Sequence, residues 1–257
     1  MKIVFYITLF AIFFICCKPT NYSVIDKTGS VYIIKNNASE RQEIETIIAP
    51  YKAELNKKMD VVINECTETM TIGSPQGKLG NFVADLCLKL IIDSLKLADD
   101  YLNAVILNNG GLRTHLPKGE ITVRKIFEIM PFENQLVIIE LDGTNFRNAI
   151  EAIALKCKST ENEKGCIPFS GIEITVCQSA NNILVNNSPI DTNGTYRVLT
   201  SDYLANGGDN MHFFSVPISL LYTNVKLRDA IIYHIEREFR LGNKISGSTD
   251  NRIRYVE

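Results

Sequence analysis

Hydrophobic residues recur along this chain at two spacings, one typical of helices and the other of strands. Helical spacing covers residues 40–60, 78–98, 145–155 and 227–239, and a shorter helix is expected from Thr122 to Met130. Buried or alternating apolar runs predict strands at residues 61–63, 104–107, 135–141, 172–177, 183–185 and 196–200. Helices and strands alternate without strict βαβ spacing, so the predicted class is α+β rather than a doubly wound sheet.

Two of the predicted helices have clear boundary signals. The Thr122 hydroxyl is expected to cap the helix that runs to Met130, and Pro131 ends that helix. Asp142 and Gly143 predict a turn, after which Thr144 is expected to cap the helix at residues 145–155. The helix at residues 78–98 carries a broad apolar stripe, which predicts packing against a sheet.

The N-terminus has the pattern of an export signal. Lys2 precedes an apolar run at residues 3–15 that is too short for a permanent membrane span. The run ends at Cys16-Cys17-Lys18 and resembles a bacterial lipoprotein signal, with residues 1–16 removed and Cys17 lipidated. Residues 17–39 then form a polar tether. We expect an exported chain, lipid-anchored on the periplasmic or cell-surface side of a bacterial membrane; the alternative is an ordinary secretory signal with two incidental cysteines.

Export would place the other cysteines in an oxidising compartment. These are Cys66, Cys87, Cys157, Cys166 and Cys177. Cys157 and Cys166 flank a polar stretch and could close it with a disulfide, although the sequence leaves the pairing open. Cys87 lies on an apolar helix face and is expected to be a small buried hydrophobe.

Charge and histidine content exclude some functions. The net charge of −2 and the pI of about 6.0 give no basic field for a nucleic-acid polymer. The histidines are His115, His212 and His234, with no His/Asp spacing that could build a two-metal centre. We therefore expect no metal and no cofactor in this chain.

Two glycine-rich loops carry the clearest functional signal. They contain Gly110 and Gly111 in the first, and Gly207 and Gly208 in the second. Adjacent glycines leave main-chain N–H groups uncovered and let the backbone approach an anion or a flat ring. Each loop is expected directly after a strand, so that the two form opposite walls of one ligand site.

These loops belong to a set of motifs that resembles the C-terminal domain of the 5′-nucleotidase family. The motifs are residues 79–85 (LGNFVAD), 108–113 (NNGGLR), 116–122 (LPKGEIT), 131–134 (PFEN) and 202–209 (DYLANGGD). Their order and spacing match over residues 40–257. The resemblance implies a four-layer α/β/β/α sandwich whose role is nucleotide recognition.

The resemblance also implies roles for single residues. Arg113 matches an arginine that faces the phosphates, the alternative being a surface salt bridge. Asn108 matches a nucleotide contact, or it could brace the turn. Phe132 matches the aromatic residue that stacks on the base, or it could be a core residue. Asn134 is expected to hold its loop, and Asp209 to tie the second glycine loop by accepting main-chain N–H bonds.

Two departures from the family pattern stand out. The second aromatic residue of the base clamp is expected two positions after Asp209, where this chain has Met211, with Phe213 two positions further on. A phosphate-facing arginine is expected shortly before Leu79, where this chain has only Lys78. These changes predict weaker phosphate binding or a different ligand.

Two functional hypotheses follow. In the family, hydrolysis belongs to an N-terminal domain that holds two metal ions, and residues 17–40 contain no motif for such a centre. We therefore expect no autonomous activity. The first hypothesis is the nucleotide-recognition half of a split 5′-nucleotidase, acting in nucleotide catabolism with a separate metallophosphatase chain that holds the divalent metals. The alternative is a non-catalytic lipoprotein that binds nucleosides or nucleotides.

Overall fold

The computed structural model describes residue 29 and residues 42–158, 167–177, 181–250 and 252–256. The expected signal peptide, Cys17 and nearly all of the tether therefore lie outside the described residues. Residues 1–48 and residues 49–257 form two separate units. Helix α2 (Gln42–Met59) confirms the helix predicted at residues 40–60. Its apolar side chains are exposed, namely Ile44, Ile47, Ile48, Tyr51 and Leu55.

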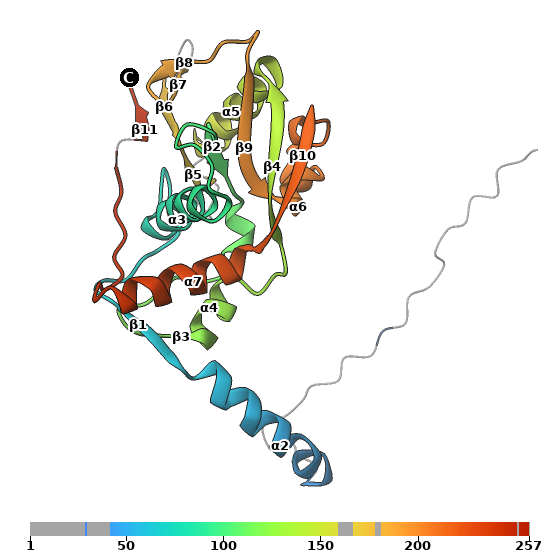
Figure 1. Ribbon diagram of the computed structural model, residues 1–257, viewed down its shortest axis with the longest axis vertical. Coiled ribbons are helices and arrows are strands. Elements are labelled where there is room, and N and C mark those ends of the chain that lie inside the picture. Colours follow the sequence, from blue (N-terminus) through green and yellow to red (C-terminus); the bar gives the residue numbers. More distant parts are fainter. Residues whose placement is uncertain (1–28, 30–41, 159–166, 178–180, 251, 257) are drawn as a thin grey trace, which may run out of the picture. The chain divides into compact units, whose positions relative to one another are not determined.

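The centre of the second unit is a five-stranded sheet with the order β10-β4-β9-β2-β5 (Figure 1). Its strands are β10 (Ser219–Lys226), β4 (Gln135–Asp142), β9 (Thr195–Ser201), β2 (Ala104–Ile106) and β5 (Phe169–Ser170). Strands β2 and β9 are parallel, and the other neighbouring pairs are antiparallel. Apolar side chains of β4 alternate between two cores, with Leu136 on one face and Val137 on the other.

Helices cover the first face of this sheet. The core on this side joins the sheet to α3 (Lys78–Leu95), α4 (Val123–Ile129) and α7 (Leu227–Arg240), and to the two-stranded sheet of β1 (Val62–Cys66) and β3 (Gly119–Thr122). The apolar stripe of α3 packs in this core, as predicted. Thr122 accepts a hydrogen bond from the Lys125 N–H at 3.2 Å, which confirms the predicted cap of α4.

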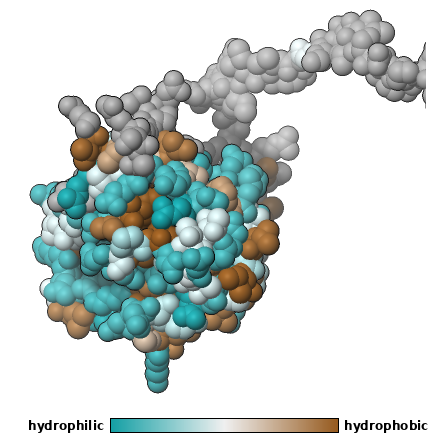
Figure 2. Space-filling view, turned by 90° about the horizontal axis from the view of Figure 1, so that it is seen from above, coloured by the Kyte–Doolittle hydropathy of each residue, from teal (hydrophilic) through white to brown (hydrophobic). Residues whose placement is uncertain are grey.

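The second face packs against α5 (Gly143–Lys158) and a four-stranded sheet. That sheet has the order β11 (Ile253–Tyr255), β6 (Ile172–Val176), β7 (Asn182–Val185) and β8 (Ser188–Pro189). The layered α+β class predicted from the sequence is confirmed. No helix among the described residues is both long enough and apolar enough to span a bilayer. Figure 2 shows a mainly hydrophilic face with hydrophobic residues in a few separate groups.

Several local expectations need correction. Val61 and Val62 are about half exposed, so only Ile63 of the predicted strand at residues 61–63 is buried. The cap of α5 is the Asp142 carboxylate, which accepts from the Asn145 N–H at 2.9 Å, and not the exposed Thr144. This hydrogen bond lowers the pKa of Asp142. Strand β10 was not predicted at all.

The described cysteines differ in their surroundings. Cys87 is completely buried on α3, which confirms the hydrophobic role predicted for it, and burial raises the pKa of its thiol. Cys157 is disulfide-bonded. The partner suggested for it, Cys166, lies outside the described residues, so that pairing stays a prediction.

Candidate functional site

Three segments that are distant in sequence meet at one edge of the five-stranded sheet. Parallel strands β2 and β9 end at the same edge, and antiparallel β4 begins there, with Leu136 paired to Ser201. The Thr200 hydroxyl links the strand ends by donating to the Ile106 carbonyl at 2.7 Å. We call residues 108–113, 131–134 and 202–213 the loop edge. This edge gathers every predicted ligand-binding residue into one region.

The first segment is the glycine loop after β2. Its backbone turns through a short 3₁₀ helix (Asn109–Gly111), closed by a hydrogen bond of 3.2 Å from the Gly111 N–H to the Asn108 carbonyl. The Asn108 amide lies against both glycines: a Cβ on Gly110 or Gly111 would come within 3.3 or 3.2 Å of it. Asn108 is buried, yet its side chain makes no capping hydrogen bond. The Asn108 amide therefore does not cap this 3₁₀ helix, although it packs against both glycines.

Arg113 ends the same loop with its side chain exposed. Its main-chain N–H donates to the Ile129 carbonyl at 2.8 Å, and Nη1 donates to the Gly110 carbonyl at 3.3 Å. Arg113 forms no ion pair with a described residue, which does not support the surface salt bridge considered as its alternative role. An exposed guanidinium without an ion-pair partner can form paired hydrogen bonds to an anion.

The second segment follows β9 by way of the short helix α6 (Asp202–Ala205), rather than directly as predicted. Gly207 has a φ of 86°, a conformation that L-residues rarely adopt. A Cβ on Gly208 would lie 2.5 Å from the Tyr203 ring. Both glycines are therefore required by this turn, and the ring of Tyr203 lies directly on it.

Asp209 has a different role from the one predicted. Its carboxylate accepts from the Tyr203 hydroxyl at 2.9 Å, and the Asp209 N–H donates to the same hydroxyl at 3.3 Å. The hydrogen bond to the carboxylate raises the pKa of Tyr203. A Cβ on Gly110 would lie 3.9 Å from Asp209 Oδ2, so the two glycine loops are adjacent, as predicted.

The third segment joins α4 to β4 and carries Phe132. This side chain is 42% exposed, which excludes the alternative that it is a core residue. The main-chain carbonyl of Asn134 accepts from the Leu227 N–H at 2.9 Å. Any residue could form this bond, so the loop-holding role of the Asn134 side chain stays a prediction. Asn134 also lines an open hollow of about 470 Å³ together with Asp202, Tyr203, Asn206, Gly207 and Gly208.

The structure changes which side chains can form the second wall of the base clamp. Met211 is completely buried in the core beside α5 and offers no surface to a ligand, so of the two residues considered for the second side of the clamp it is Phe213 that stays a candidate. Phe213 is half-buried against the same core. Tyr203, which the sequence reasoning missed, is 43% exposed and lines the hollow. Its aromatic ring inside the motif at residues 202–209 was the available signal.

Two further expectations from the sequence concern a phosphate-facing cation near Leu79 and metal ligands. Lys78, the only cation in the segment where a phosphate-facing arginine is expected, pairs with Glu68. Among the described residues, no group of three His, Cys, Asp or Glu side chains could hold a metal ion.

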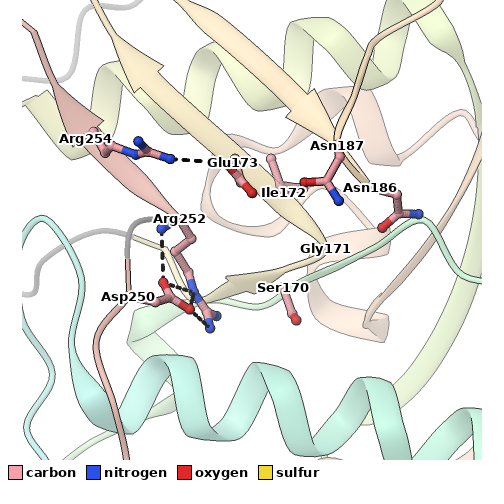
Figure 3. A pocket seen from close by; sticks show the side chains of 9 residues that line it. All are labelled: Ser170, Gly171, Ile172, Glu173, Asn186, Asn187, Asp250, Arg252 and Arg254. Carbon is pink, nitrogen blue, oxygen red and sulfur yellow. Dashed lines mark hydrogen bonds and ion pairs between the residues drawn. The ribbon is translucent and has the colours of Figure 1, made fainter.

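A separate hollow of about 380 Å³ lies between β6, β11 and the turn at Asn186 and Asn187 (Figure 3). Its central cation, Arg252, donates to Asp250, to Asp85 and to the Phe169 carbonyl. These interactions use all of its N–H donors, and Arg252 lowers the pKa of Asp250. Arg252 therefore fastens β11 to α3 and β5 and is not free to bind an anion.

The fold and the loop edge together match a known family. Its sequence profile, described as "5′-nucleotidase, C-terminal domain", matches residues 58–216, which is more than half of the chain. The chain belongs to this family. The matched region includes every residue named above at the loop edge.

Relatives of the chain are larger proteins. It is 28% identical to the trifunctional nucleotide phosphoesterase YfkN of Bacillus subtilis, covering 90% of this chain but 16% of that protein. It is 27% identical to a probable 5′-nucleotidase of Treponema pallidum, covering 53% of this chain and 25% of that protein. The chain thus spans a quarter or less of these relatives.

Solved structures share the fold. The 5′-nucleotidase precursor of Thermus thermophilus superposes with a TM-score of 0.68 at 22% identity, covering 82% of this chain and 43% of that one. The NAD nucleotidase of Haemophilus influenzae gives a TM-score of 0.62 at 18% identity, covering 84% of this chain and 41% of that one. At these identities the likeness establishes the fold.

Proposed function

We propose that this chain binds a nucleoside or nucleotide at the loop edge, with the base held by Phe132 and Tyr203. The supporting observation is that both rings are exposed, and that Tyr203 on α6 shares a hollow with Asn134 from the loop of Phe132. Stacking of one base on an aromatic side chain typically contributes about 1–3 kcal/mol. Phe213 remains a further candidate for the wall of this site.

The glycine loops would receive the rest of the ligand. The first loop carries the Asn108 amide, which has no capping partner, and the Arg113 guanidinium, which forms no ion pair with a described residue. Gly110 of this loop lies next to Asp209 of the second. An arginine fork suits a phosphate, and an amide suits a hydroxyl or carbonyl group of a nucleoside. This arrangement favours a nucleoside monophosphate as the ligand class.

We propose further that the chain works with a dimetal phosphatase centre on a separate polypeptide. The named relatives are nucleotide phosphoesterases and nucleotidases, and this chain corresponds to only part of each. The partner's divalent metals would supply the hydrolytic chemistry, while this chain holds the base and orients the phosphate. The same proposal includes export of this chain and a lipid on Cys17. The Thermus thermophilus neighbour is a 5′-nucleotidase precursor.

The alternative is a binding protein that acts without a partner. The pairing of Lys78 with Glu68 favours it, because a cation expected to face phosphate is already neutralised by a carboxylate. In that case the ligand would be a nucleoside rather than a nucleotide.

Phosphate release distinguishes the two. The full chain, a separately produced dimetal phosphatase domain and their mixture are each incubated with AMP and UMP in manganese or zinc. We expect release from the mixture alone, with a KM about tenfold higher for Phe132→Ala. Phe239→Ala is the matched control, because Phe239 is an exposed aromatic residue on α7 outside the loop edge, and it should leave KM unchanged. Absence of release from every mixture contradicts the split enzyme, and nucleoside binding by the chain alone would then support the alternative.

A further inference from the structure

Phe132 lies on a loop with little apolar anchoring of its own. Pro131, Phe132 and Glu133 are all exposed. Ordering a mobile loop upon binding reduces affinity, so an aromatic side chain on such a loop stacks well only if the main chain is already fixed. The structure shows what fixes it.

A buried arginine from α7 holds this loop. Arg228 is 5% exposed; its Nη1 donates to the Pro131 carbonyl at 3.1 Å and to the Phe132 carbonyl at 3.5 Å. Its Nη2 donates to the Glu133 carboxylate. One guanidinium therefore contacts three successive residues, which a lysine with its single nitrogen could not do in the same way.

The Arg228 guanidinium also packs on an aromatic ring. It lies 4.0 Å from the ring centroid of Phe127, on the helix that precedes the loop. A desolvated cation over an aromatic face is a favourable contact. Arg228 Nε is buried without a hydrogen-bond partner among the described residues, so the side chain depends on its contacts with Phe127 and the loop.

Neighbouring residues complete the attachment. Lys226 also donates to the Glu133 carboxylate, and these two cations lower the pKa of Glu133 to about 2. Glu133 is therefore ionised at neutral pH and stays paired. The Leu227 N–H donates to the Asn134 carbonyl at 2.9 Å, so residues 226–228 fasten both ends of the loop.

We propose that Arg228 is a positioning residue for base recognition: it fixes the main chain of residues 131–133 so that the Phe132 ring is in its stacking position before the ligand arrives. The proposal rests on the proposed function, because it assigns to Phe132 the stacking of a base. It concerns the base alone, so ribose 5-phosphate, which has no base, should bind independently of Arg228.

The first test is a double-mutant cycle on the full chain, with adenosine and ribose 5-phosphate as probes in calorimetry. Arg228→Met should weaken adenosine binding about tenfold and leave ribose 5-phosphate unaffected. In a Phe132→Ala background, Arg228→Met should have no further effect. Arg237→Met, at an arginine of the same helix that contacts Asp93, is the control and should change nothing. Equal weakening in both backgrounds, or none in the wild-type background, overturns the proposal.

The second test needs no ligand. Amide hydrogen exchange of Phe132, Glu133 and Asn134 should be faster in Arg228→Met than in wild type, and unchanged in Arg237→Met. Unchanged exchange in Arg228→Met overturns the proposal whatever the titrations give. If wild type binds neither adenosine nor AMP, the proposed function fails while exchange still decides the role of Arg228. Arg228→Lys, which keeps the charge but loses the fork, replaces the methionine variant if that variant does not fold.

Discussion

At the residue scale, the segment at residues 202–213 of the loop edge directs one of its large side chains, Tyr203, to solvent and another, Met211, into the core. The Ser201 hydroxyl caps α6 by accepting from the Leu204 N–H at 3.2 Å, and Tyr203 then faces outward while Met211 enters the core. The family resemblance pointed to Phe132 and Arg113 as ligand-facing residues, and both side chains are exposed. The sequence could not show that Met211 is buried and Tyr203 exposed, because the path of the loop decides which of the two side chains meets solvent.

Gly208 tests this geometry directly. A Cβ there would lie 2.5 Å from the Tyr203 ring and 2.6 Å from the Tyr203 carbonyl. We expect Gly208→Ala to cost about 1–3 kcal/mol of unfolding free energy through overpacking, measured by urea denaturation. Gly110→Ala is the milder control, since its nearest neighbour is the Asn108 amide at 3.3 Å. An unchanged stability of Gly208→Ala would contradict the described contact of Tyr203 with the glycine turn.

At the element scale, helices and strands with a clear hydrophobic pattern were predicted from the sequence, whereas elements with a weak pattern were missed. The stripe of α3 is clear because one face of that helix is buried, and the apolar run of β4 is clear because both faces of that strand are buried. Strand β10 lies at the edge of the sheet with Leu220, Leu221 and Tyr222 about half exposed, and its sequence shows neither a long buried run nor an alternation of apolar and polar residues. Strands of two or three residues, such as β5, are too short to show any period.

The start of α5 gives a second prediction. Both oxygens of the Asp142 carboxylate are used by Asn145, one by its main-chain N–H and the other by its amide at 2.7 Å. Asp142→Ala should therefore lower the free energy of unfolding by about 1 kcal/mol. Thr144→Ala, at the exposed residue that the sequence suggested as the cap, should stay within about 0.5 kcal/mol of wild type. Chemical denaturation measures both, and a larger loss for Thr144→Ala would reverse the assignment.

At the scale of the whole molecule, the site exists only because segments far apart in sequence converge. The hydrogen bond between Thr200 and Ile106 spans 94 positions, and the parallel pairing of β2 with β9 brings both glycine loops to one edge. The adjacent glycines and their expected places after strands predicted that the two loops form one site, and the family resemblance agreed with this. The hydrophobic pattern alone could not predict that the loops meet, because local periodicity does not encode the order and direction of the strands.

The central claim, that the loop edge binds a nucleobase between Phe132 and Tyr203, is tested most directly by calorimetric titration of AMP and adenosine into the full chain. We expect saturable binding that weakens about tenfold in Phe132→Ala and in Tyr203→Ala, and that is unchanged in Phe239→Ala. Absence of binding by the wild-type chain, or binding that both loop-edge variants leave intact, would contradict the account.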